Sequence, residues 1–217
     1  MQIFLDTANV EEIKEGVATG VVRGVTTNPT IISRENKPFD QCIRDILAID
    51  PTLTVLVEVL AANTEGMIEE ARTFARTYGD TIVVKIPMTA PGLAAVNVLS
   101  QEKVPTAVTL VFSLNQAIAA SCAGADYAAA FVGRLDDINA DGVGLIRSIR
   151  RTFDAQRAAT KILAASLRTP QAVSELFAAG CDVVTMPGKI LSAMFNHPLT
   201  EAGLQKFHED WQRVPRP

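Results

Sequence analysis

Apolar residues follow two alternating patterns along this 217-residue chain. Eight short runs are almost continuously apolar, which is typical of parallel strands that are buried on both faces. Between and after them lie segments in which apolar residues recur every three or four positions, as on one face of a helix. The eight runs are IFLDTA (3–8), GVTTNP (24–29), LTVLVEVL (53–60), TIVVKIPM (81–88), PTAVTLVF (105–112), YAAAFVGR (127–134), KILAASLR (161–168) and DVVTMP (182–187). The expected helices are 9–19, 38–49, 64–78, 91–101, 113–123, 141–156, 169–179, 187–196 and 199–213.

Several of these helices carry residues that favour a helix end. We expect Thr64 to cap the helix 64–78, Ser113 to cap the helix 113–123, and Thr169 followed by Pro170 to begin the helix 169–179, because hydroxyl side chains satisfy free amide groups there. Glycine, which favours helix termination, follows each of the three, at Gly79, Gly124 and Gly180.

Strands that alternate with helices through short loops predict a parallel sheet. Eight such units in about 200 residues predict an α/β protein with a single (β/α)8 TIM barrel over residues 1–217, near the lower size limit of that fold. The last segment, about 199–213, is then an extra C-terminal helix. An open doubly wound sheet is the alternative, but it favours a glycine-rich loop after the first strand, and the sequence there is DTANVEE.

Polar residues interrupt the strands near their carboxyl ends, which meet at one mouth in a barrel. Each has a structural explanation by itself. Lys85 could reach past the rim to water, Glu58 and Lys85 could form a structural ion pair, and Asp6 or Asn28 could cap the loop that follows. Together they indicate a functional site, because burying so many polar groups costs free energy. The set comprises Asp6, Thr26, Thr27, Asn28, Glu58, Lys85, Thr109, Arg134, Ser166 and Arg168.

A lysine within an apolar strand has a specific chemistry. Burial favours the neutral amine, which attacks a ketone to form an iminium ion that acts as an electron sink. Asp6 and Glu58 are candidate proton shuttles, Glu58 through a water held by Thr109. Arginine forks and a hydroxyl suit a phosphate group, and Arg134, Ser166 and Arg168 could supply them. The residues therefore predict a Schiff-base enzyme that acts on a phosphorylated carbonyl compound.

Composition narrows the class of protein further. The net charge is −4 and no basic stripe occurs, so we expect no nucleic-acid partner. The three cysteines form no CxxC pair, which favours reduced thiols and a cytoplasmic protein. His197 and His208 lack neighbours at metal-ligand spacing, so no histidine-based zinc site is expected. The acidic residue at position 6 argues against a secretory signal, and no apolar run is long enough for a membrane span.

Longer motifs connect the chain to a known family over essentially its whole length. FLDTAN, GVTTNPTII, VVKIPMT, GLAAVNVLS, TLVFSLNQA, FVGRLDDI, LAASLRTP and HPLTEAGLQKFHEDW resemble the short-chain transaldolase family, which includes the fructose-6-phosphate aldolases. The resemblance implies a barrel enzyme without a cofactor, in which Lys85 forms the Schiff base. It further implies that Asp6 is the acid/base residue and that Glu58 works with a catalytic water, with Thr109 as its partner. Thr26 and Asn28 would hold the dihydroxyacetone unit. The phosphate would be bound by Arg134, Ser166 and Arg168.

The family also implies a ring-shaped homo-oligomer, a decamer or pentamer, in which the C-terminal helix packs on a neighbouring subunit. Leu204, Phe207 and Trp211 fall on one face of the helix 199–213, at a spacing of three and four. This helix follows the eighth barrel helix, so its own barrel leaves little surface for it to cover. We therefore expect a partner subunit to cover this face.

Two positions separate the branches of the family. Glu58 and Phe131 resemble transaldolases, whereas the aldolases carry glutamine and tyrosine there. The implied reaction is transfer of a dihydroxyacetone unit from sedoheptulose 7-phosphate to glyceraldehyde 3-phosphate, giving erythrose 4-phosphate and fructose 6-phosphate. Ala107 and Ala129 depart from the asparagine and serine usual in transaldolases. A fructose-6-phosphate aldolase, which joins dihydroxyacetone and glyceraldehyde 3-phosphate, is therefore the alternative. A non-catalytic sugar-phosphate-binding barrel is a remote one, because Lys85, Asp6 and Glu58 are all present.

Overall fold

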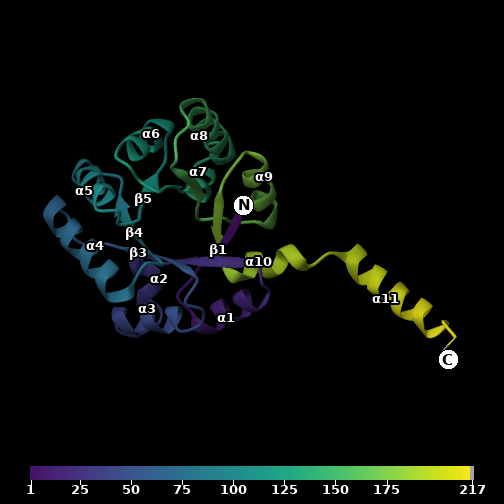
Figure 1. The fold of residues 1–217 in the computed structure, drawn as a ribbon. Helices are drawn as coiled ribbons and strands as arrows, with labels where there is room; N and C mark the ends of the chain where they lie inside the picture. The colour runs from purple at the N-terminus through teal and green to yellow at the C-terminus, as the bar shows by residue number, and fades with distance from the viewer. Residues whose placement is uncertain (216–217) are drawn as a thin grey trace.

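Eight parallel strands close into a barrel in chain order in the computed structural model, which describes residues 1–215 (Figure 1). The predicted (β/α)8 barrel is therefore confirmed, and the open sheet is excluded. Residues 216 and 217, the end of the predicted single domain, lie outside the described part. The strands are β1 (Gln2–Asp6), β2 (Val22–Thr26), β3 (Thr54–Glu58), β4 (Ile82–Pro87), β5 (Thr106–Val111), β6 (Tyr127–Ala130), β7 (Lys161–Ala164) and β8 (Val183–Met186).

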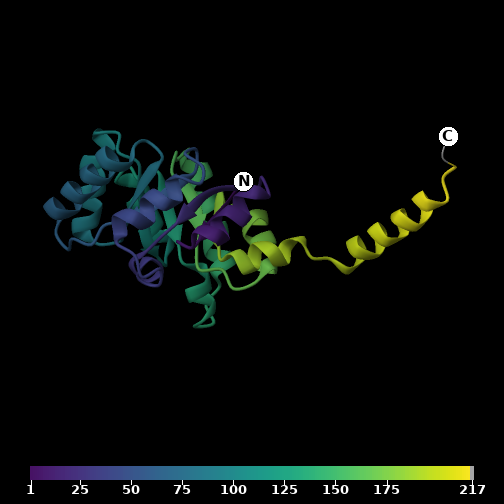
Figure 2. The same ribbon diagram turned by 90° about the horizontal axis from the view of Figure 1, so that it is seen from below.

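Helices surround the barrel and cover its outer face (Figures 1 and 2). All nine predicted helices are present, with ends within a few residues of the expected ones. The structure has α1 (Val10–Ala18), α2 (Pro29–Ser33), α3 (Phe39–Leu47), α4 (Thr64–Tyr78), α5 (Ala90–Gln101), α6 (Leu114–Cys122), α7 (Val132–Asp136), α8 (Gly142–Gln156), α9 (Pro170–Ala178), α10 (Gly188–Phe195) and α11 (Pro198–Gln212).

Two of these helices, α2 and α7, were not predicted from the sequence. Each has five residues, which is too short for a helical period of apolar residues to appear. The helix caps are mostly as expected, since Ser113 and Thr169 accept hydrogen bonds from Gln116 and Ala172. The prediction for Thr64 was wrong. Asn63, one residue before Thr64, caps α4 instead. Its side-chain oxygen accepts a hydrogen bond from the Gly66 amide and so satisfies a free amide group of the first turn.

The strands bury both faces, and each face has its own apolar cluster. The larger cluster joins the outer face of the sheet to the helices, while a smaller one fills the barrel interior. Because side chains alternate along a strand, one position in two points inward. The interior cluster comprises Phe4, Leu56, Val83, Ala107, Tyr127, Ala129, Leu163, Ala165 and Val183. It closes the barrel interior below the carboxyl ends of the strands. A cavity inside the barrel can therefore open only at the mouth formed by those ends.

The final helix, α11, projects away from the barrel (Figures 1 and 2). None of its residues is buried within the chain. Leu204, Phe207 and Trp211 are 63%, 72% and 69% exposed, so the predicted apolar face lacks a cover from its own subunit. Among residues 1–215, no helix is long and apolar enough to cross a membrane.

Candidate active site

The side chains that point inward at the carboxyl ends of the strands are polar. Asp6 and Thr26 are paired across β1 and β2, and Glu58 and Lys85 are paired across β3 and β4. Each lies two positions beyond an inward-facing residue of its strand, and therefore points the same way. The structure thus brings the first members of the predicted site together at one mouth.

Lys85 lies at the centre of this group and is only 5% exposed. Its Nζ donates to the backbone carbonyl of Thr27 over 2.8 Å and to the Glu58 carboxylate over 3.0 Å. The side chain therefore does not reach past the rim to water, which was one structural alternative. The ion pair with Glu58 does form, and these two contacts offset part of the cost of burying the ammonium group.

Asp6 lies beside Lys85 at the end of β1. It accepts a hydrogen bond from the Thr26 hydroxyl over 2.7 Å. Burial raises the pKa of Asp6 above its ordinary value, while the Thr26 hydrogen bond and the positive charge of Lys85 act in the opposite direction. A carboxyl group in this balance is suited to exchange protons with a bound molecule.

Thr109 reaches the same space from β5, two positions after the inward-facing Ala107. The register with β6 shifts between Val108 and Val111, and Leu110 has a φ of 62°, a conformation that side chains other than glycine rarely adopt. This irregularity leaves Leu110 beside the mouth. The Thr109 hydroxyl is buried and bonds to no other described group, so it is available to a bound molecule.

Asn28 has a structural role as well as a place in the site. Its side-chain oxygen accepts from the Ile31 amide and caps α2, as one structural alternative expected. Its amide nitrogen donates to no group among residues 1–215 and is available to a bound molecule. Lys85, Asp6, Thr26, Thr109, Asn28 and Phe131 all line one inner cavity.

An outer cavity of about 440 Å³ opens above the inner one, within the usual size range of small-molecule sites. Arg168 donates through Nη2 to Asp137 over 2.8 Å, and its other guanidinium nitrogens bond to nothing else in the described part of the chain. Phe131 lines both cavities and lies 6.0 Å from the Arg134 guanidinium and 5.9 Å from the Phe112 ring.

Apart from Thr27, every predicted site residue borders at least one of the two cavities. The outer cavity is lined by Arg134, Ser166 and Arg168 together with Asp6, Asn28, Glu58 and Phe131.

The basic side of the outer cavity depends on one close backbone approach. A Cβ atom on Gly133 would lie within 1.7 Å of the Ser166 carbonyl oxygen, so only glycine allows α7 to lie against the loop after β7. Ser166 itself has a φ of 68°. These two features bring Arg134 next to Ser166 and Arg168, although the residues come from different strands.

Thr185 and Arg34 also border the site, and neither was predicted from the sequence. Thr185 lines the inner cavity and Arg34 the outer one. Thr185 could have been found, because it lies two positions after the inward-facing Val183 of β8, as Asp6 does after Phe4. Arg34 could not, because it follows the short helix α2 that the sequence pattern did not reveal.

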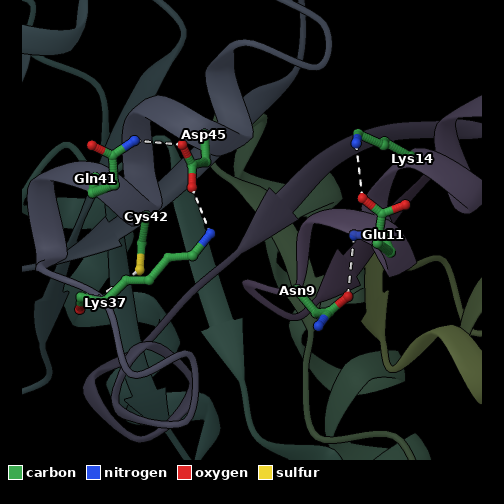
Figure 3. A network of polar contacts seen from close by, with 7 residues as sticks. All are labelled: Asn9, Glu11, Lys14, Lys37, Gln41, Cys42 and Asp45. Carbon is green, nitrogen blue, oxygen red and sulfur yellow. Dashed lines mark hydrogen bonds and ion pairs between the residues drawn. The ribbon is translucent and has the colours of Figure 1, made fainter.

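A second group of polar contacts lies on the outer wall of the barrel (Figure 3). Lys37 and Gln41 both donate to Asp45, while Glu11 accepts from Lys14. The open groove around them is lined by side chains of both charges. Since these exposed charges already neutralise one another, the group stabilises α1 and α3 only weakly and resembles an ordinary surface.

The fold and site define a (β/α)8 barrel enzyme in which polar groups converge on a buried lysine. The family model described as transaldolase/fructose-6-phosphate aldolase matches residues 3–216, and the chain belongs to this family of enzymes. A probable transaldolase of Hydrogenobaculum sp. is 49% identical over 215 residues, covering 99% of this chain and 98% of the relative. Probable transaldolases of Aquifex aeolicus, at 99% and 98% coverage, and Methanococcus maripaludis, at 98% of each chain, are both 48% identical. The resemblance inferred from the motifs is therefore confirmed.

Solved structures of distant sequence share the barrel. A crystal structure of 3-hexulose-6-phosphate synthase has a TM-score of 0.65 at 14% identity, covering 88% of this chain and 92% of that one. A structure titled native KDPGal has a TM-score of 0.60 at 15% identity, with coverage of 85% and 84%. These likenesses show the fold alone.

The contact between Gly133 and Ser166 gives a direct test of how the outer cavity is built. We expect Gly133→Ala to lower the free energy of unfolding by ~1–3 kcal/mol, the usual cost of overpacking, because the new methyl group meets a backbone oxygen. Gly203→Ala is the matched control, since nothing lies within 4 Å of the position that a Cβ atom would take there. Urea unfolding of both variants measures the difference, and equal stabilities would show that the close approach is not required.

Proposed function

We propose that the protein is a transaldolase that transfers a dihydroxyacetone unit between sugar phosphates through a Schiff base on Lys85. The observation that carries this proposal is the position of Lys85. Its Nζ is buried at the mouth, bonded to Glu58, and lies in one cavity with Asp6 and the unbonded Thr109 hydroxyl. Membership of the transaldolase/fructose-6-phosphate aldolase family supports the same chemistry.

The first half of the reaction follows from these positions. Lys85 gives up a proton, which Glu58 is placed to take, and its neutral amine attacks the C2 ketone of the donor. Loss of water from the resulting carbinolamine gives the iminium ion. Asp6 then takes the proton of the C4 hydroxyl, the C3–C4 bond breaks, and its electron pair moves into the iminium as an enamine. The shortened aldose phosphate leaves. Glu58, 3.0 Å from Nζ, is placed to exchange protons with the amine and with a water that Thr109 holds.

The second half reverses these steps with another aldehyde. The enamine attacks the aldehyde carbon of the acceptor, the developing alkoxide takes the proton back from Asp6, and water then hydrolyses the iminium to release the new ketose. Arg134, Ser166 and Arg168 are proposed to hold the phosphate of both donor and acceptor through charge-assisted hydrogen bonds. Thr26 is proposed to act on the donor indirectly, since its hydroxyl is bonded to Asp6.

Glu58 and Phe131 favour the transferase over the aldolase. A phenylalanine cannot donate a proton to the bound three-carbon unit, so this unit stays on Lys85 until an acceptor arrives. The proposed substrates are sedoheptulose 7-phosphate with glyceraldehyde 3-phosphate, and erythrose 4-phosphate with fructose 6-phosphate, as in the pentose phosphate pathway. The three free cysteines support a cytoplasmic location for this activity.

Ala107 and Ala129 favour the alternative, a fructose-6-phosphate aldolase. Both are buried and point into the barrel; Ala107 is the register partner of Lys85, and Ala129 lines the inner cavity with it. Neither offers a hydrogen bond to a donor sugar, and the usual transaldolase residues at these positions would. Free dihydroxyacetone would then be a product, which distinguishes the two reactions in an assay.

We also propose that α11 packs on a neighbouring subunit of a homo-oligomer, a pentamer or decamer. Its apolar face, made by Leu204, Phe207 and Trp211, is exposed in the single chain. Tryptophan and phenylalanine are typical anchors of protein interfaces, and an isolated helix of this length is only marginally stable in water.

Trapping with borohydride tests the Schiff base. Reduction in the presence of fructose 6-phosphate is expected to inactivate the enzyme and to attach a stable secondary-amine adduct to Lys85, which peptide mass spectrometry locates. Lys85→Met should give neither turnover nor adduct, whereas the control Lys189→Met, which changes an exposed lysine after β8, should retain both. An adduct on another lysine, with Lys85→Met still active, would contradict the assignment.

A coupled assay that compares transfer with release tests the branch of the family. The unmodified enzyme is expected to transfer the three-carbon unit to erythrose 4-phosphate and to release little dihydroxyacetone. Phe131→Tyr should raise the release by about 10²-fold or less, the scale of one general acid, and adding Glu58→Gln should raise it further. Phe112→Tyr is the control, because the neighbouring ring lines neither cavity. Release as fast as transfer in the unmodified enzyme would establish the aldolase instead.

Truncation after His197 tests the assembly. Analytical ultracentrifugation should show a large oligomer for the full chain and smaller species for the truncated one. Phe207→Ser with Trp211→Ser should weaken the oligomer while keeping the helix in place. An unchanged oligomer in both variants would mean that α11 does not hold the subunits together.

A further inference from the structure

We propose that Thr185 is a positioning residue, whose hydroxyl donates to Thr26 and so strengthens the hydrogen bond that Thr26 makes to Asp6. The effect of this residue on turnover rests on the proposed function, in which Asp6 is the base. Its effect on the Asp6 carboxyl does not rest on that function, and the two effects can be measured separately.

The direction of these hydrogen bonds follows from counting protons. The Thr26 hydroxyl lies 2.7 Å from an Asp6 oxygen and 2.6 Å from the Thr185 hydroxyl. A hydroxyl has one proton to donate, and an ionised Asp6 can only accept. Thr26 therefore donates to Asp6, and Thr185 must donate to Thr26. The three groups form one chain across β8, β2 and β1, with every bond pointing toward the carboxylate.

This chain of hydroxyl groups orients and polarises the hydrogen bond to Asp6, and it does not conduct protons to solvent. Thr185 is 1% exposed and Thr26 is 2% exposed. In the described part of the protein, the Thr185 hydroxyl bonds to no group other than Thr26. A proton that reached Thr185 would have no further acceptor there. The function left to the chain is to stabilise negative charge on Asp6, because linked hydrogen bonds polarise one another.

Asp6 needs this stabilisation of its negative charge because burial is the largest influence on its pKa. Burial raises the pKa of Asp6, the Thr26 hydrogen bond lowers it most effectively, and the nearby Lys85 charge lowers it as well. Glu12 and Glu58 act in the same direction as burial. The other charged groups at this mouth are the guanidinium groups that line the outer cavity, those of Arg34, Arg134 and Arg168.

The catalytic consequence concerns the acidic side of the pH profile. Asp6 must be ionised to take the proton of the C4 hydroxyl. If Thr185 is removed, the bond from Thr26 weakens and the carboxylate is less favoured. The pH below which turnover falls should therefore move upward, while activity well above that pH should change little.

Infrared titration of the resting enzyme tests the inference without any substrate. The carboxyl band of Asp6 is isolated by subtracting the spectrum of Asp6→Asn. In Thr185→Val the midpoint is expected to move up by about half a pH unit, since cooperative polarisation strengthens a hydrogen bond by roughly 10–30%. Thr26→Val should move the midpoint further. Thr185→Ser should keep the midpoint of the unmodified enzyme, because serine keeps the hydroxyl.

Thr106→Val is the matched control. Thr106 is also buried in a barrel strand, but its hydroxyl has no hydrogen-bond partner in the described part of the chain and it lies at the amino end of β5. The same substitution there should leave the Asp6 midpoint unchanged. An unchanged midpoint in Thr185→Val, or failure of Thr185→Ser to restore a changed one, would overturn the proposed role.

The pH profile of turnover connects this result to catalysis. With transfer from fructose 6-phosphate to erythrose 4-phosphate as the readout, the acidic limb in Thr185→Val should move up together with the infrared midpoint, and in Thr185→Ser it should not. If the unmodified enzyme neither transfers nor cleaves fructose 6-phosphate, the proposed function fails, and the infrared midpoints still decide whether Thr185 acts on Asp6.

Discussion

The burial of one ammonium group constrains the rest of this site. Lys85 lies in an apolar strand and is almost completely removed from water. Such a charge is tolerated only where other polar groups accept its protons. Glu58 on the adjacent strand and the carbonyl of Thr27 meet this need. The carboxyl ends of β2, β3 and β4 are thereby tied together around the lysine, and the cavity forms beside them.

Closing the barrel gives this lysine its surroundings. Strands that would be distant in an open sheet each place one inward side chain at the same depth. Small residues on the far side, Ala129 and Ala165, leave the space that the long lysine chain and the inner cavity occupy. Aromatic residues beneath this cavity, Phe4 and Tyr127, fill the interior. Function is therefore confined to one end of a barrel that is packed at the other.

Two unusual backbone conformations and one close backbone approach lie at the same mouth. Leu110 and Ser166 both adopt positive φ angles, and Gly133 allows a contact that no other residue would permit. Conformations of this kind cost free energy and persist only where the surrounding structure enforces them. Here the packed strands and helices outside the site supply that support, and the gain is a rim on which groups from β5, β6 and β7 face one space.

The sequence alone determined the eight strands, the nine longer helices, the barrel and the family, because periodic apolar residues and long motifs are local properties of the chain. It also located Lys85, Asp6 and Glu58 at strand ends. The partners of these residues could not be derived in this way. That Asp137 would bond to Arg168, that Thr26 would face Asp6, and that Thr185 would complete the chain of hydroxyl groups depends on tertiary contacts. The register of neighbouring strands decides the first two contacts, and barrel closure, which joins β8 to β1, decides the third.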